Sequence, residues 1–315
     1  MTQPISKLST LLALGILSAP TILQAEEATP SYSLDVDLLY MERDESPSQP
    51  LFSSIGALGT GDLLRAEGID PGQEPGLNIN FRAQMTNRLG FEFGGFFVNE
   101  FSSSLTLPGT PNGEGITQYA VGGSTSGDMD YTSKIFGLHL NATHPYQNGI
   151  TVIGGLRHLS LDESFSMTYR PSNLAVNYVT MNNLFGAQLG VRADWNSVFG
   201  TTSGAWNGGV ELLGGVLNNS ISSATFGGSG VGPSNDNADE TTWFVQAGIN
   251  ADYTVRPGLV LSLGYQALWI DDVAHVTDQI GTTEALASGI GGPRTTIRTD
   301  DILIHGIKFG LTYEF

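Results

Sequence analysis

Charged and amide side chains occupy alternate positions in several segments of this chain, with apolar residues between them. Successive side chains of a β-strand point to opposite faces, so this spacing places the polar groups on one face of each strand. Acids and bases are both present, and such groups can line a narrow charge-selective passage or pair with one another and fill it. The candidates for this lumen-lining face are Asp35, Asp37, Arg82, Glu92, Arg157, Glu163, Gln188, Arg192, Asp194, Glu211, Asp252, Lys308 and Glu314.

A second set of residues has the types found in hydrolase active sites. Asp271, Asp272 and His275 follow an apolar segment, and the omptin proteases, which are ten-stranded barrels, use acidic residues and a histidine at the outer rim. Catalysis needs further partners from facing strands, and a lipase needs a serine within reach of a histidine. His139 and His158 stand in mid-segment with no such motif around them. We therefore expect no enzyme, with an omptin-like rim protease as the third alternative.

The elements that position these groups are ten segments with period-2 alternation, each about as long as a tilted transmembrane strand. They are residues 32–40, 77–85, 89–100, 136–142, 150–163, 182–195, 206–216, 243–253, 259–267 and 303–315. The face opposite the polar one carries Leu, Val, Phe and Ala with almost no charge. A soluble β-sandwich would have to hide that apolar band, so the pattern favours a membrane barrel with an even strand number.

The connections between these segments alternate in length. Residues 86–88, 144–149, 196–205 and 256–258 are short, and residues 43–75, 102–128, 164–180, 219–240 and 271–300 are long. Short periplasmic turns and long outer loops are typical of outer-membrane barrels. We predict an all-β, antiparallel up-and-down transmembrane barrel of about ten strands, or twelve if a long loop hides a hairpin. Continued alternation at 165–169 and 176–178 also predicts a hairpin that projects outward.

Aromatic residues gather where the predicted strands end, as they do in the interface girdles of membrane barrels. The girdle candidates are Tyr32, Tyr40, Trp195, Trp206, Trp243, Tyr253, Trp269, Tyr313 and Phe315.

Residues 1–25 have the layout of a secretory signal peptide, with Lys7, an apolar run at 11–17 and Ala25 before the expected cleavage. This predicts an exported barrel domain at 26–315 that reaches the outer membrane through the periplasm. Lys7 is the only charged residue of the leader, so its removal changes the formal net charge from −18 to −19. Such an acidic chain repels a phosphate backbone, and we expect no nucleic-acid partner.

The chain contains no cysteine, which excludes a disulfide framework and a thiolate metal site. Acidic clusters in the long connections match no defined calcium loop. The sequence therefore predicts neither a metal site nor a cofactor. No stretch reaches the ~18 uninterrupted apolar residues that a transmembrane helix needs.

Four of the strand segments resemble the beta-barrel porin-7 family in their amino-acid sequence and in their order along the chain. They are residues 154–163 (GGLRHLSLDE), 182–190 (NNLFGAQLG), 264–269 (GYQALW) running on to 273–274 (VA) and 278–279 (DQ), and 305–311 (HGIKFGL). His158 stands where an aromatic residue is common in the family. The resemblance implies a porin-like outer-membrane barrel with no catalytic residues and no defined substrate. The terminal Phe315 resembles the signal by which the barrel-assembly machinery recognises its clients.

From these observations we expect passive, porin-like passage of small solutes or ions through a charge-lined lumen. The net acidic balance of the lumen predicts a preference for cations. The alternative is a closed structural barrel that presents outer loops to a partner at the cell surface. The expected partners are outer-membrane lipid and, through the strand that ends at Phe315, the barrel-assembly machinery.

Overall fold

The computed structural model describes residues 30–44, 50–56, 59–65, 70–107, 126–146, 149–170, 174–195, 205–227, 234–281 and 297–315. The predicted signal peptide at 1–25 lies outside these residues.

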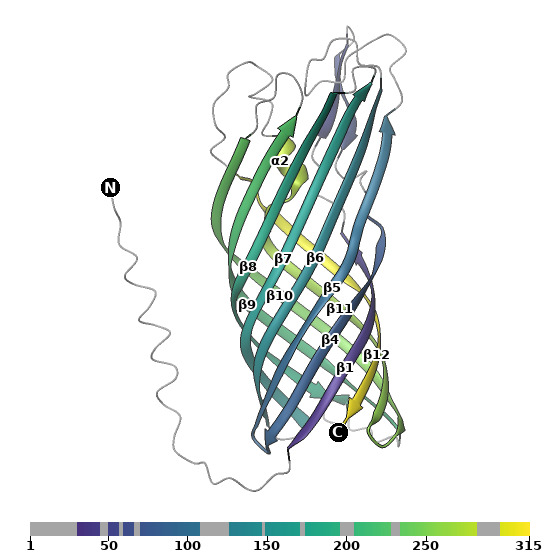
Figure 1. Ribbon diagram of the computed structural model, residues 1–315, viewed down its shortest axis with the longest axis vertical. Coiled ribbons are helices and arrows are strands. Elements are labelled where there is room, and N and C mark those ends of the chain that lie inside the picture. The colour runs from purple at the N-terminus through teal and green to yellow at the C-terminus, as the bar shows by residue number, and fades with distance from the viewer. Residues whose placement is uncertain are drawn as a thin grey trace, which may run out of the picture.

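Ten antiparallel strands form a closed barrel (Figure 1). They are β1 (Ser31–Arg43), β4 (Gln73–Thr86), β5 (Leu89–Leu107), β6 (Ser126–Pro145), β7 (Ile150–Arg170), β8 (Leu174–Asp194), β9 (Trp206–Gly227), β10 (Ser234–Arg256), β11 (Leu259–Val273) and β12 (Asp300–Glu314). Each strand pairs with its neighbour in the chain, and β1 also pairs with β12 over eleven residues from Ser33 to Arg43, which closes the ring. The prediction of ten strands is confirmed.

The connection between β1 and β4 contains a hairpin, β2 (Pro50–Gly56) and β3 (Gly59–Arg65). These two strands pair only with each other, in a separate two-stranded sheet. β1 pairs directly with β4 from Ser31 to Glu42, so the barrel ladder has no gap in which the hairpin could insert. The alternative of twelve barrel strands is therefore wrong, although a long connection does hide a hairpin.

The barrel has two different ends, defined by its connections. The turn end holds the tight turns after β4 and β10 together with the start of β1 and the end of β12, where Tyr32 and Phe315 exchange backbone hydrogen bonds of 3.1 and 2.9 Å. Gly258 has φ of 79° in the turn after β10, a conformation that favours glycine. The opposite end is the loop end.

The strands differ in length, and the difference extends one side of the barrel. β6 to β10 have 20 to 23 residues, whereas β1, β4, β11 and β12 have 13 to 15. Figure 1 shows the long strands continuing past the others at the loop end. The predicted connections at 102–128, 164–180 and 219–240 are thus wrong in part, because each contains strand residues. The predicted projecting hairpin, β7–β8, is confirmed and belongs to this taller wall.

The alternation of faces follows the prediction on every strand. Leu34, Leu38 and Tyr40 of β1 are exposed on the outer surface, while Asp35 and Asp37 between them are buried inside. The outer surface therefore carries a belt of apolar side chains that water would not tolerate over such an area. This belt is the surface that a lipid bilayer covers.

One short helix, α2 (Val276–Gly281), lies inside the loop end (Figure 1) and packs against β2, β7 and β8. No helix in the described part of the chain is long and apolar enough to span a membrane.

Candidate functional site

The interior of the barrel divides into two halves of different chemistry, and the half near the turn end is a polar chamber. Cavities of about 90 and 180 Å³ lie within it, and a third of about 580 Å³ opens at the turn end beside Tyr32, Glu314 and Phe315. The chamber exists because strands β1, β4, β5, β8 and β9 turn their charged residues inward at this level. Glycines on β9 and β10 leave part of it unfilled.

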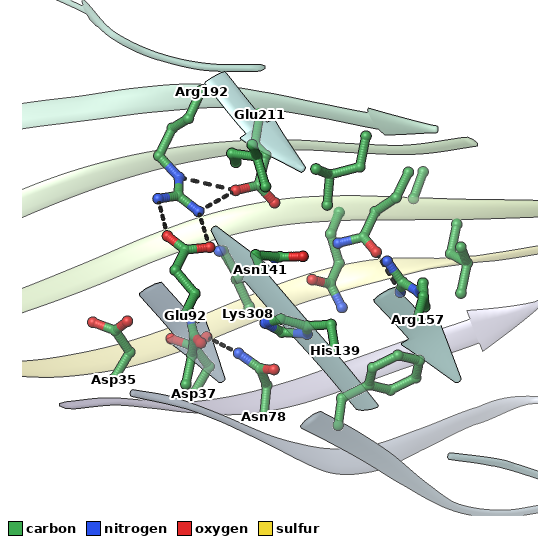
Figure 2. A pocket seen from close by; sticks show the side chains of 18 of the residues that line it. Asp35, Asp37, Asn78, Glu92, His139, Asn141, Arg157, Arg192, Glu211 and Lys308 are labelled. Atoms are coloured by element: carbon green, nitrogen blue, oxygen red, sulfur yellow. Dashed lines mark hydrogen bonds and ion pairs between the residues drawn. The ribbon is translucent and has the colours of Figure 1, made fainter. Parts of the chain in front are cut away.

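An arginine network crosses the chamber. Arg192 of β8 donates to Glu92 of β5 on the far wall at 2.6 Å and to Glu211 of the adjacent β9 at 2.6 and 2.9 Å (Figure 2). Arg82 lies 3.0 Å from Asp35, an ion pair between the neighbouring strands β4 and β1. Hydrogen-bonded ion pairs are what buried charges require. The lumen charges therefore hold opposite walls together.

The remaining predicted lumen residues also lie on the inner face. Asp37 accepts a hydrogen bond of 2.7 Å from Asn78, and Lys308 lines the same cavity. Asp194 and Asp252 line the chamber nearer the turn end, and Glu314 lines its mouth. The acidic residues are thus concentrated toward the mouth.

Arg157 and Gln188 lie at the inner end of the chamber, where it meets the second half of the lumen. Gln188 donates to Asn141 at 2.6 Å, and Arg157 donates to Gln188 at 3.3 Å and to Gln246 at 2.6 Å. The Arg157 guanidinium also lies 4.8 Å from the centre of the Phe244 ring. A strip of amides from β6, β8 and β10 therefore surrounds this one cation.

The loop-end half of the lumen is an apolar layer, formed where the inner faces change from polar to apolar. On β7 the change falls between Arg157 and Leu159, although Ile153 on the turn-end side of Arg157 is also apolar and buried, and on β1 it falls between Asp37 and Leu39. The buried layer consists of Leu39, Met41, Val98, Phe101, Ile135, Ile153, Leu159, Leu161, Leu184, Leu213, Leu217, Phe244, Leu268, Ile270, Val273, Ile302 and Ile304. Barrels near eight strands are narrow enough for side chains to fill, and the side chains of this layer pack together in one buried cluster.

Residues 273–279, called the strap, lie buried at the loop end beside this layer. Asp272, the second-last residue of β11, has a φ of 49°, and its carbonyl accepts hydrogen bonds from Asn219 and Thr242. Asn182 then holds Ala274 by two hydrogen bonds of 2.8 and 2.9 Å. Every strap residue is at most 2% exposed. The strap is therefore packed as tightly as the core of a soluble protein.

A buried polar cluster, called the latch, ties the strap to the walls. Glu163 of β7 accepts hydrogen bonds from the Val276 backbone at 2.7 Å and from the Tyr131 hydroxyl at 3.1 Å, and His275 Nδ1 lies 3.4 Å away. Arg43 of β1 reaches across the lumen to form an ion pair with Glu163 and a hydrogen bond with Tyr131. The predicted lumen residue Glu163 thus serves the closure rather than the polar chamber.

Asp278 is the acidic residue of the strap. Burial raises the pKa of its carboxyl to about 6, with Asp300 adding repulsion and His275 opposing the shift. One of its carboxylate oxygens is buried without a hydrogen-bond partner among the described residues. The strap therefore contains one group whose charge its surroundings disfavour.

The rim residues considered for proteolysis lie in and beside this closure. His275 is 1% exposed, with its two nitrogens near Glu163 and the Asp301 carbonyl. Asp272 accepts a hydrogen bond from Thr299. Of the mid-segment histidines, His139 lines the polar chamber, and His158 faces outward and contacts Asn183 at 2.8 Å. The structure does not bring these groups together at a surface that a substrate could reach.

Most of the aromatic girdle candidates lie on the outer surface. At the turn end the Tyr32 ring stacks on Phe315 at 5.9 Å, Tyr313 stacks on Phe315 at 5.8 Å, and Trp206 packs on Tyr253 at 5.0 Å. Toward the loop end, Tyr40 and Trp243 are exposed, and Trp269 donates to Asp301. Trp195, the residue after β8, is half-buried beside Gly208.

The apolar layer and the strap were missed by sequence reasoning, although part of the signal was present. Residues 38–41 (LLYM), 267–270 (ALWI) and 302–304 (ILI) are apolar at consecutive positions. A strand buried on both faces reads as such a run, because neither face meets water. These runs all fall in the loop-end half of their strands.

The fold and the charge-lined interior define a transmembrane β-barrel. The chain belongs to the family described as Putative beta barrel porin-7, whose model matches residues 116–315, well over half of the chain. The predicted family is confirmed.

Comparison with solved structures finds other barrels. The outer membrane protease OmpT from Escherichia coli is 9% identical with a TM-score of 0.48, covering 93% of this chain and 99% of that one. The attachment invasion locus protein Ail of Yersinia pestis is 9% identical with a TM-score of 0.31, covering 91% and 100%. The toluene transporter TodX of P. putida is 10% identical with a TM-score of 0.29, covering 90% and 89%. We draw nothing about function from scores this low, and no curated protein matches the chain.

Proposed function

We propose that this protein is an outer-membrane barrel that is closed along its axis and presents its loop end to a partner at the cell surface. The observation that carries the proposal is the apolar layer, which fills the lumen with side chains from nine of the ten strands. An ion that entered this layer would lose its hydration without gaining a partner, which costs several kcal/mol or more. In this reading the turn end faces the periplasm.

The strap supports the same conclusion. A passage through the barrel would require residues 273–279 to leave a site where Asn182 and Glu163 satisfy their backbone groups. It would also require the apolar side chains beneath to rearrange. A solute passing along the lumen would therefore have to displace both the strap and the apolar layer. The wall formed by β6 to β10 remains available as the surface that a partner contacts.

A planar-bilayer recording tests the closed barrel. The refolded protein is incorporated at increasing amounts, and insertion is confirmed separately by heat-modifiable mobility on a gel. We expect no discrete conductance steps from inserted protein. Steady single-channel steps from the wild type would overturn the proposal.

Porin-like passage is the second candidate, and the polar chamber favours it. Its cavities contain charged side chains and lie next to the wide cavity at the turn end. Such a chamber would suit hydrated solutes if the loop-end half opened. Under this alternative the bilayer shows discrete steps, and reversal potentials in a salt gradient show the cation preference expected from the acidic mouth.

We further propose that the protein has no enzymatic activity. The burial of His275 supports this, since an omptin-like mechanism needs its histidine to reach a substrate. Incubation of the refolded protein with a peptide library, followed by mass spectrometry, should show no cleavage. Peptide cleavage by the wild type that is lost in His275→Ala would contradict this proposal and support an omptin-like protease.

A further inference from the structure

Arg157 differs from the other arginines of the lumen in its partners. Arg43, Arg82 and Arg192 each form an ion pair with a carboxylate. Within the described residues, no ion pair joins Arg157 to any carboxylate, although only 3% of its surface is exposed. A guanidinium stays protonated in proteins. Arg157 is therefore a buried positive charge with no direct counter-charge from the described chain.

The contacts of Arg157 are neutral. Two amide oxygens, from Gln188 and Gln246, accept one hydrogen bond each, and the Phe244 ring covers part of the cation. Its Nε is buried and has no hydrogen-bond partner in the part of the chain that the structure describes. A guanidinium has five donors, so most of its capacity is unused by these acceptors.

The carboxylates of the chamber do not compensate this charge directly. Glu211 interacts with Arg157 through space, but its Oε2 already accepts two hydrogen bonds from Arg192. Asp37 is bound by Asn78. Figure 2 shows Arg157 at one end of the pocket, with Asp35, Asp37, Glu92, Arg192 and Glu211 gathered toward the other. The carboxylates and the arginine that pairs with them therefore lie away from Arg157, at the other end of the cavity.

A cavity of about 90 Å³ lies beside Arg157, large enough for a small ion and its remaining waters. Arg157, His139 and Asn141 line it with groups that can donate hydrogen bonds, and Phe96, Ile153 and Leu213 supply apolar wall. Its carboxylates are already engaged by Arg82, Asn78 and Arg192; they are Asp35, Asp37, Glu92 and Glu211. Apolar wall disfavours a strongly hydrated multivalent anion, whereas a monovalent halide gives up water more easily.

We propose that the cavity beside Arg157 binds a small monovalent inorganic anion of the size of chloride. The anion supplies the counter-charge that a buried guanidinium needs. It also accepts hydrogen bonds from those N–H groups of Arg157 that do not donate to Gln188 or Gln246. The site goes beyond the proposed function, because it holds for a closed barrel and for a conducting one.

Crystals of the refolded protein grown or soaked in sodium bromide test the site. Bromide is the probe because its anomalous scattering locates it without ambiguity from water. We expect an anomalous peak within hydrogen-bond distance of the Arg157 guanidinium. The absence of a peak there in well-diffracting wild-type crystals would overturn the proposal, as would peaks confined to the outer surface.

Two variants test whether the Arg157 side chain binds the bromide. Arg157→Gln should abolish it, whereas Arg82→Gln, which removes a half-exposed and ion-paired arginine of the same chamber, should leave it in place. A bromide peak that persists in Arg157→Gln contradicts the role of this side chain.

A solution measurement keeps the proposal testable if Arg157→Gln does not fold. The unfolding midpoint of the wild type in denaturant is measured as sodium bromide replaces sodium gluconate at constant ionic strength. Because a ligand that binds only the folded state stabilises it, the midpoint should rise with bromide concentration. A midpoint that does not change with bromide overturns the proposal.

Discussion

Replacing Glu163 with glutamine should release the strap from the barrel wall. Glu163 accepts hydrogen bonds from Val276 and Tyr131 and pairs with Arg43, and its side chain has no exposed surface. Glutamine keeps the shape but removes the charge. Arg43, whose side chain is 1% exposed, then remains buried without its counter-charge.

The size of the effect follows from that unpaired charge. Removing one partner of a buried ion pair costs about 3–5 kcal/mol. Since ~1.4 kcal/mol corresponds to a factor of ten, the local opening of the strap should become more frequent by a factor between about 10² and about 4 × 10³. The barrel ladder itself is untouched, because Glu163 contributes no ladder hydrogen bond through its side chain.

Hydrogen exchange followed by mass spectrometry measures this opening, since local stability appears as amide protection. Peptides covering the strap should lose protection by that factor in Glu163→Gln, while peptides from β11 and β12 change little. Glu100→Gln is the matched control, because it breaks the exposed Glu100–Lys134 pair on β5 and β6 and should leave the strap unchanged. Equal protection of the strap in Glu163→Gln and wild type would refute the role of the latch.

Three further outcomes are expected. Arg192→Gln removes the cation that Glu92 and the partly exposed Glu211 share, while Arg82 remains 3.6 Å from Glu92, so the free energy of unfolding in denaturant should fall by about 1.5–3 kcal/mol; an unchanged unfolding midpoint would contradict a stabilising role of this network. The raised pKa of Asp278 means that the closed strap binds a proton more tightly than the open strap. Strap protection should therefore fall, by at most about 100-fold, as pH rises from about 4 to above 6. Asp278→Asn should remove this dependence, and a strap whose protection is flat across that range argues against it. Phe315→Ala should lower the heat-modifiable, folded fraction in cells several-fold, and a normal yield would dissociate the terminal residue from assembly.

Both halves of the lumen contribute to the stability and the shape of the barrel. The polar chamber stabilises the barrel through ion pairs that cross from β8 to β5, and the latch crosses from β1 to β7. Both connect strands that are not neighbours in the ladder. Such cross-lumen contacts fix the shape of the ring, which backbone pairing between adjacent strands alone does not.

The sequence by itself determined the elements and their faces. Alternation such as Leu34, Asp35, Val36 and Asp37 can be read directly, because the side-chain period of a strand is two and membrane and lumen demand opposite polarity. The number of barrel strands and the inward placement of charges such as Arg192 followed from that rule. The ends of the strands could not be predicted from this rule, because β6 to β10 continue beyond the apolar belt, where the outer face is no longer required to be apolar.

Only the tertiary structure decided which inner residues meet and whether the lumen is filled. Arg192 and Glu92 are 100 residues apart and Arg43 and Glu163 lie on opposite walls, so their pairing depends on ring closure and strand stagger. The strap was expected as part of an outer loop, since Val273, Ala274 and His275 show no strand period. Its burial results from a cavity that exists only once the ten strands have closed around it.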